Sequence, residues 1–267
     1  MNIQLGQFVP GTSVVHRLDA RIKLLLMVAY IVLIFLVKEL PVFLIPLAYM
    51  MLAILLSGIS PLYALTALKP MKWLLLFMFV INIFFTHGET VLFSLWKLSV
   101  TKEGILQAVF ITIRLVLLVS GTSLLTLTTS PLALTDGLEQ IFQPLTVFKF
   151  PAHELAMMMT IALRFIPTLL EETDRIRKAQ MARGADFESG NLLARAKAMV
   201  PVLVPLFVSA FRRADELAMA MESRCYHGGE GRTRMRETHL HPADGWAVLV
   251  TALFIAAVPI TQSLLFR

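Results

Sequence analysis

Two arginines lie in similar settings, each at the end of a segment that reads as an amphipathic helix. Each is flanked by small residues, in Ala182-Arg183-Gly184 and again in Ser223-Arg224-Cys225. A guanidinium is a rigid fork that binds carboxylates or carbonyl oxygens, and small neighbours leave room for a partner's backbone. One such arginine could simply complement the helix dipole. Two of them, 41 positions apart, favour a contact that is used twice.

Residues that could perform catalysis are not grouped in a recognisable way. The six histidines are scattered, and no phosphate-binding glycine loop followed by lysine and serine or threonine is present. His239 and His241 could bind a metal together with His227, but two histidines two positions apart in a polar stretch are a weak signal. A solvated loop is the stronger interpretation, so we expect neither a metal nor another cofactor in this chain.

One charge lies inside an apolar run: Arg114 in "FITIRLVLLVSG". A charge at membrane depth is costly and faces protein or water. Arg114 could contact a partner or take part in gating. We favour a structural role, in which it bonds to carbonyls of neighbouring helices, with Asn82 as a candidate acceptor.

The composition indicates an all-α, polytopic membrane protein. Of the 267 residues, 57% are hydrophobic and only 16% are charged, against about 25% charged in soluble domains. Uninterrupted apolar runs such as "LLLMVAYIVLIFLV" exclude a membrane β-barrel, whose strands alternate polar and apolar residues. The single cysteine excludes an internal disulfide, and we expect no removable signal peptide.

Five apolar stretches are predicted to cross the membrane: about 22–40, 42–58, 70–87, 104–129 and 245–266. Several are shorter than the roughly 20 residues that a bilayer needs, so flanking lysines must reach to the interfaces. Most lysines and arginines lie near the N-terminus or in the charged region that follows the fourth span. Basic residues favour the cytoplasmic side, so we expect both of these parts to be cytoplasmic and the C-terminus to lie outside.

The charged region, residues 130–244, separates the membrane segments 1–129 and 245–267. Two apolar runs inside it, at 154–170 and 199–211, could also be taken as spans. Crossing would place a strongly basic loop outside and immerse charged residues in lipid. We therefore predict long amphipathic cytoplasmic helices instead.

Prolines and glycines divide this region into helices. A first helix starts at Ser130 and Pro131, a second at Pro151, and a third extends from about Pro167 to Arg183 and ends at Gly184. A fourth begins near Asn191, is interrupted at Pro201 and Pro205, and continues to about Cys225.

Four segments together resemble the transmembrane coupling subunit of energy-coupling factor transporters, the EcfT or CbiQ-type family. They are "HRLDARIKLLL", "SLLTLTTSPLAL", "ELAMMMTIALRFIPTLLEETDRIRKAQMARGADF" and "AMAMESRCY". The resemblance covers nearly the whole chain. Ala20 stands where the family often has proline, and the second arginine motif departs from Ala-Arg-Gly at both flanks.

The resemblance implies a non-catalytic subunit of an importer for vitamins or metal ions, in the plasma membrane of a prokaryote. Ala182, Arg183 and Gly184 dock on one ABC-type ATPase, and Ser223, Arg224 and Cys225 dock on a second. ATP and Mg²⁺ are bound by these ATPases. A separate membrane protein, the S component, captures the solute, and no nucleic acid is involved.

A methionine-rich surface is the candidate contact for the S component. Methionine suits surfaces that accept several partners, although burial between the chain's own helices is nearly as plausible. The candidate residues are Met157, Met158, Met159, Met219 and Met221.

Three alternatives remain open at this point. The first is a self-contained membrane enzyme with a metal at His227, His239 and His241. The second is a secondary carrier, although the spans show no inverted repeat. The third is a subunit dedicated to cobalt or nickel transport.

Overall fold

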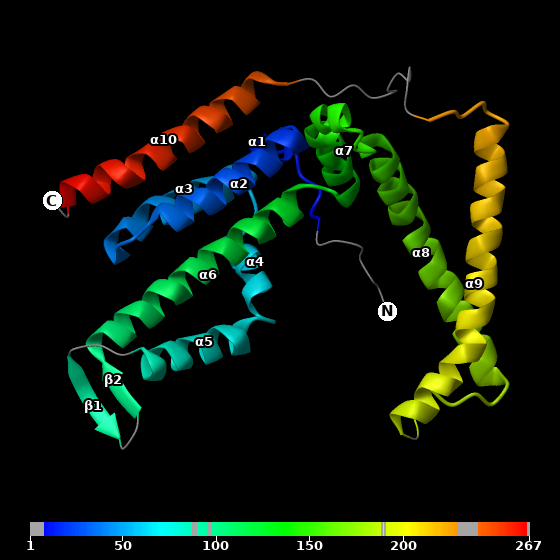
Figure 1. Ribbon diagram of the computed structural model, residues 1–267, viewed down its shortest axis with the longest axis horizontal. Helices are drawn as coiled ribbons and strands as arrows, with labels where there is room; N and C mark the ends of the chain where they lie inside the picture. The colour runs from blue at the N-terminus through cyan, green and yellow to red at the C-terminus, as the bar shows by residue number, and fades with distance from the viewer. Residues whose placement is uncertain are drawn as a thin grey trace. The chain divides into compact units, whose positions relative to one another are not determined.

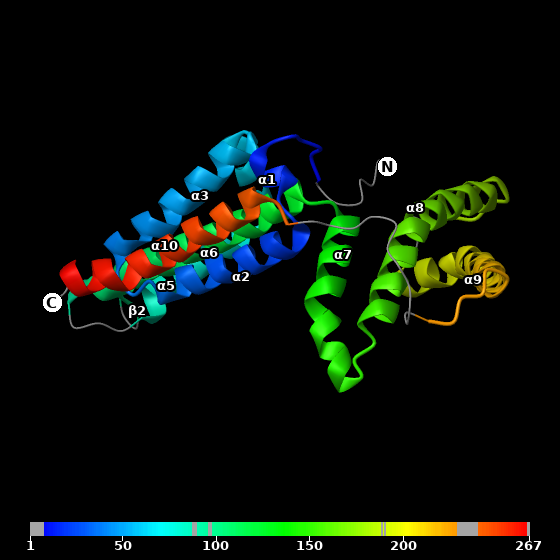
Figure 2. The same cartoon turned by 90° about the horizontal axis from the view of Figure 1, so that it is seen from above.

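The structure is a computed structural model that describes residues 8–86, 90–95, 98–187, 189, 191–228 and 240–265. The chain divides into two compact units (Figures 1 and 2). The first unit contains Met1–Gly137 and Glu237–Arg267, and the second contains Leu138–Arg236. In the first unit, helices come from both ends of the chain, so its core needs segments that lie far apart in the sequence.

The first unit is built mainly of apolar helices. Its long elements are α2 (Ala20–Leu36), α3 (Leu44–Ser57), α5 (Lys72–Phe85), α6 (Lys102–Thr128) and α10 (Pro242–Leu265). The short elements are α1 (Val14–Arg17), η1 (Leu40–Phe43), α4 (Pro61–Ala64) and η2 (Leu65–Leu68), together with β1 (Val91–Leu95) and β2 (Leu98–Thr101). α7 (Pro131–Phe142) begins in this unit and ends in the other.

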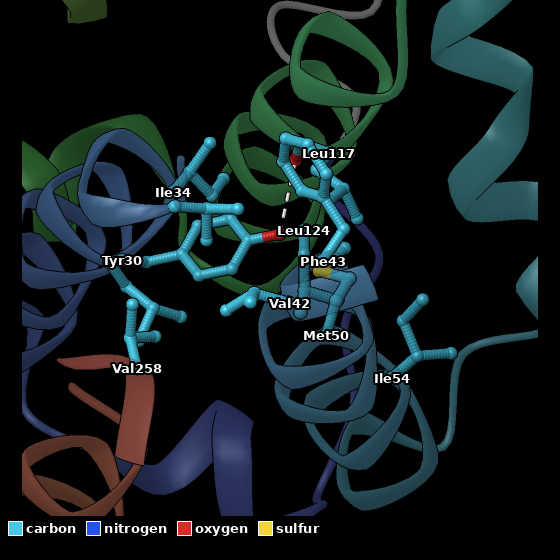
Figure 3. Close-up of a cluster of buried hydrophobic side chains, with 11 residues drawn as sticks. Tyr30, Ile34, Val42, Phe43, Met50, Ile54, Leu117, Leu124 and Val258 are labelled. Carbon is cyan, nitrogen blue, oxygen red and sulfur yellow. Dashed lines mark hydrogen bonds between the residues drawn. The ribbon is translucent and has the colours of Figure 1, made fainter. Parts of the chain in front are cut away.

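Helices α2, α3, α6 and α10 share one apolar core (Figure 3). Tyr30 of α2 lies at its centre, where its ring stacks on Tyr49 at 5.4 Å between centroids. The Tyr30 hydroxyl donates a hydrogen bond to the Leu117 carbonyl at 3.3 Å. Its polar end is therefore satisfied inside an apolar core, as a buried tyrosine requires.

Among the residues that the structure describes, five helical segments are long and apolar enough to cross a membrane: Leu40–Ser57, α6, Ala152–Ala182, Leu193–Glu222 and α10. This confirms an all-α polytopic fold, and three of the five agree with predicted spans. The other two lie in the region that we expected to be cytoplasmic. The predicted first and third spans form α2 and α5, which are helices of 17 and 14 residues.

A two-stranded hairpin between α5 and α6 was not predicted. β1 and β2 pair antiparallel, with Leu95 opposite Leu98. The end of the hairpin is fixed to the helices, because the Thr101 hydroxyl donates to the Thr86 carbonyl at 3.1 Å and accepts from the Gly104 amide. Thr101 is thus also the N-cap of α6, which explains where that helix begins.

The second unit is a pair of 31-residue helices, α8 (Ala152–Ala182) and α9 (Leu192–Glu222), preceded by η3 (Gln143–Phe148). α9 begins next to Asn191 as predicted, and the Asn191 side chain caps it by accepting a bond from the Ala194 amide. The predicted helix boundaries at Pro167, Pro201 and Pro205 are wrong, because all three prolines lie inside continuous helices. A proline removes one backbone bond, and the remaining bonds of a long helix hold it together.

The predicted start of the charged region, at residue 130, lies before the start of the second unit. Ser130 caps α7 as expected, through a bond from the Ala133 amide at 3.2 Å. However, Gly137 lies so close to α2 that a methyl group on it would approach the Ala20 backbone to 3.1 Å. The first turns of α7 therefore belong to the packing of the first unit.

Candidate functional site: two arginine-tipped helices

The end of α8 is a tight left-handed cap around Arg183. The Arg183 amide bonds to the Gln180 carbonyl, the Gly184 amide to the Met181 carbonyl, and the Ala185 amide returns to Gln180, each at 3.0 Å. Gly184 has a φ of +87°, a conformation that costs glycine almost nothing. Gly184 therefore ends the helix as predicted and leaves Arg183 at its tip.

The end of α9 repeats this geometry 41 positions later. The amides of Arg224, Cys225 and Tyr226 bond to the carbonyls of Met221, Glu222 and again Met221, at 3.1, 2.9 and 3.0 Å. Cys225 takes the place of Gly184, with a φ of +55°. The two tips thus have the same backbone fold although their flanking residues differ.

Both arginines present their side chains to the surroundings. Ala182, Arg183 and Gly184 are exposed, and so are Ser223, Arg224 and Cys225. Within the described residues, neither guanidinium has a hydrogen-bond or ion-pair partner. Since the tip amides are used inside the caps, each tip offers mainly a cation for binding a carboxylate or carbonyl oxygen.

The two helices cross and are held together near the middle of the pair (Figure 1). Arg213 of α9 donates to the Glu172 carboxylate of α8 at 2.9 Å. Nearer the tip of α8, the side-chain amide of Gln180 donates to the Pro201 carbonyl at 3.5 Å. Because α8 and α9 are antiparallel here, their arginine tips point away from the crossing in opposite directions. The Arg213–Glu172 pair has no signal in the sequence, because it depends on how α8 and α9 pack together.

The candidate methionines are largely accessible. Met219 is 64% exposed and Met158 is 54% exposed. Met159 is also exposed, while Met157 and Met221 are half-buried. Burial between the chain's own helices therefore does not account for most of them.

Comparisons with known proteins identify the family. The model of a family described as cobalt transport protein, CbiQ, matches residues 11–235. The chain belongs to the CbiQ family.

Relatives of this CbiQ-family chain carry the name energy-coupling factor transporter transmembrane protein EcfT. The protein of Thermosediminibacter oceani is 53% identical over 251 residues, which cover 94% of each chain. The protein of Clostridium kluyveri is 52% identical over 95% of this chain and 94% of its own. That of Bacillus subtilis is 47% identical over 95% of this chain and 96% of its own. The resemblance stated from the motifs is thereby confirmed.

Arg114 of the CbiQ-family chain lies within the helical bundle of the first unit. It donates to the Val37 carbonyl at 2.9 Å, and its guanidinium carbon lies 4.6 Å from the centre of the Phe110 ring. Asn82, the acceptor that the sequence suggested, instead donates to the Met78 carbonyl of its own helix. These contacts fit the structural role, in which Arg114 closes the end of α2 against α6.

The three histidines of the metal alternative do not all lie within the described residues. His239 lies outside the described residues, and His227 and His241 belong to different units. Across the ranges that the structure describes, no three histidine, cysteine, aspartate or glutamate residues are close enough to hold a metal ion.

Polar contacts at one end of the first unit were missed in the sequence, although they fall in the motif "HRLDARIKLLL". Asp244 of α10 is 2% exposed and accepts from the Asp19 amide at 3.0 Å. Lys23 is buried, and its ammonium donates to the carbonyls of His16 and Thr128, both at 3.1 Å. A lysine and an aspartate at the edges of apolar runs were the only available signal, and neither indicated its partner.

Proposed function

We propose that this chain is the energy-coupling transmembrane subunit of an ABC-type importer. In this role it links ATP hydrolysis by two ATPase subunits to solute release by a membrane S component. The observation that carries the proposal is the duplicated arginine tip, with the same three backbone bonds at a spacing of 41 residues. A contact made twice by one chain fits a pair of similar motor subunits.

The antiparallel pair gives each ATPase its own binding site. From Glu172 to Arg183 and from Arg213 to Arg224 there are eleven residues of helix, or about 16 Å along each axis. Because these two segments extend from the crossing in opposite directions, both lengths separate the tips, and two partners can dock without competing. Movement of one docked partner is transmitted through a rigid helix to the Arg213–Glu172 crossing.

The exposed methionines support an S-component contact on the same helices. Met158 and Met159 of α8 and Met219 of α9 lie at the surface, where their flexible side chains can adapt to a partner. In this proposal the chain binds no nucleotide. ATP and Mg²⁺ belong to the partner ATPases, and the chain itself is non-catalytic.

We place the N-terminus and residues 130–244 in the cytoplasm of a prokaryote and the apolar helices in its plasma membrane. Helices α8 and α9 have the length to cross a membrane, but Glu154 and Arg164 of α8 would then be immersed in lipid. Their ends must also meet soluble ATPases, and this requires the cytoplasmic side.

The solute is a vitamin or another micronutrient, and the S component determines which one. The family description mentions cobalt, whereas the names of the EcfT relatives mention no solute. The high identity to these relatives favours a subunit that serves an S component over a dedicated cobalt subunit.

Copurification tests the proposal. The double variant Arg183→Glu, Arg224→Glu should fail to retain the two ATPases, because both tips then repel the acidic or carbonyl groups that they bind. The matched control is Arg175→Glu, Arg212→Glu, which makes the same charge change at exposed positions within the same helices. Full assembly and ATP-dependent uptake by the tip variant would refute the docking role.

A further inference from the structure

A pocket of about 350 Å³ opens into the first unit between α1, α2, α3, α6 and α10. Its inner wall is formed by buried side chains, including Tyr30, Met50 and Leu124. This volume is at the lower end of the range of about 300–1,000 Å³ for small-molecule sites. It is large enough for part of a lipid and too small for a whole one.

The polar groups in the wall are already bonded to the protein. The Lys23 ammonium donates to two backbone carbonyls, and the hydroxyls of Tyr49 and Thr251 bond to each other at 3.0 Å. The Thr128 hydroxyl donates to the Leu124 carbonyl at 2.8 Å. A wall whose polar groups are satisfied offers water few partners, and such cavities stay dry or take up apolar ligands.

The rim of the pocket is apolar and exposed. It includes Leu52 and Leu56 of α3 and Trp246 of α10, which is 68% exposed. α3 and α10 are both apolar enough to cross a membrane. Tryptophan concentrates at the interface between headgroups and acyl chains, and Trp246 lies near the beginning of α10. The opening therefore faces the hydrocarbon region of the bilayer close to one of its surfaces.

We propose that this pocket binds one acyl chain of a bilayer phospholipid, while the headgroup stays outside the rim. The bilayer supplies acyl chains at very high concentration to any opening on a spanning helix, so a dry apolar cavity there will be filled. The inference is independent of the ATPase contacts, because no tip residue lines the pocket.

Substituting a large side chain for a small one in the pocket wall tests whether an acyl chain binds there. Ala247→Phe places a ring in the pocket, whereas Val248→Phe places the same ring on the exposed side of α10. The complex is purified in mild detergent and its phospholipid phosphorus is measured per chain. Ala247→Phe should lose one tightly bound phospholipid, and Val248→Phe should keep it. Ala53→Phe, with Met51→Phe as its control, repeats the comparison from α3 in case Ala247→Phe does not fold.

A fluorescence measurement tests the proposal without filling the pocket. Phospholipids brominated along the acyl chain quench the fluorescence of nearby tryptophans. The signal of Trp246 is obtained as the difference between the unmodified chain and Trp246→Phe. Trp246 should be quenched at lipid concentrations that leave Trp73 unquenched. Equal phosphorus content in all four variants, or equal quenching of Trp73 and Trp246, overturns the proposal. Loss of the S component from Ala247→Phe without loss of phospholipid would also overturn it, and would indicate that a partner's side chain occupies the pocket.

Discussion

Arg213 and Glu172, which join α9 to α8 at 2.9 Å, are separated by the same 41 residues as Arg183 and Arg224. The two helices therefore cross at equivalent points, and each continues for eleven residues from the crossing to its arginine tip. The helix pair is therefore symmetric in length about this contact, because the same length of helix separates each arginine tip from the Arg213–Glu172 ion pair.

Exchanging the charges of the crossing pair tests whether it fastens the helices. Glu172→Arg and Arg213→Glu should each lower stability, and the double exchange should recover most of the loss. Because both side chains are partly exposed, we expect a coupling free energy of about 0.5–1 kcal/mol. The check is a double-mutant cycle on thermal unfolding. Additive effects of the two single variants would show that the contact does not contribute.

Cys225 carries a conformational cost that Gly184 avoids. Cys225→Gly should stabilise the α9 cap by about 1 kcal/mol, because a φ of +55° disfavours any side chain. Gly184→Ala should destabilise the α8 cap by a similar amount, since nothing but its φ of +87° opposes a methyl group there. Thermal unfolding and ATPase copurification should be measured together. A neutral result for both variants would mean that the caps can relax.

Lys23 of α2 links the ends of α1 and α6 by bonding to a backbone carbonyl of each. Lys23→Met removes the donor for the carbonyls of His16 and Thr128, and we expect a loss of about 1–3 kcal/mol because the Thr128 contact is buried. Lys23→Arg keeps donors at this position and should restore part of the loss. Unfolding followed by circular dichroism gives both values. If methionine is tolerated as well as arginine, water must reach these carbonyls.

Gly121 permits the central packing of Tyr30. A methyl group on Gly121 would lie 2.5 Å from the Tyr30 ring, so Gly121→Ala should cost about 1–3 kcal/mol through overpacking. Adding Tyr30→Leu to Gly121→Ala should recover part of this cost, since the smaller side chain makes room. The melting temperatures of the two single variants and the double variant decide the question.

Ionised Asp19 should stabilise the folded protein, so that the melting temperature falls at acid pH. Burial alone raises the pKa of Asp19, but hydrogen bonds from Arg21 and its charge outweigh this effect, so the pKa lies below the ordinary 3.8. The ionised form is therefore favoured in the folded protein. Its stabilisation is complete above that ordinary value and is lost as the pH falls through the lowered pKa. Asp19→Asn should flatten the acid limb of a plot of melting temperature against pH, and an unchanged limb would contradict the assignment.

Local chemistry in the sequence was enough to find the arginine tips and most helix starts. Ser130 and Gly184 have the predicted cap roles, and α9 begins at the predicted Asn191, because a cap needs only residues a few positions away. Pro167 and Pro205 were misread for the same reason. A proline weakens a helix locally, while the packing that keeps α8 and α9 continuous comes from distant residues.

Long-range partners could not be read from the sequence. Arg114 was correctly suspected of bonding to a neighbouring helix, but its acceptor is the Val37 carbonyl, and a carbonyl has no signature in the sequence. The Arg213–Glu172 pair was invisible because either residue alone reads as an ordinary surface charge. The pocket likewise arises from five helices and has no motif of its own.

The bond from the Asp19 amide to Asp244 spans 225 residues and has a consequence for biogenesis. Asp19 precedes the first apolar helix to leave the ribosome, whereas Asp244 belongs to the last. Until translation reaches α10, the Asp19 amide lacks this acceptor, so the contact can form only after α2, α3 and α6 have been synthesised.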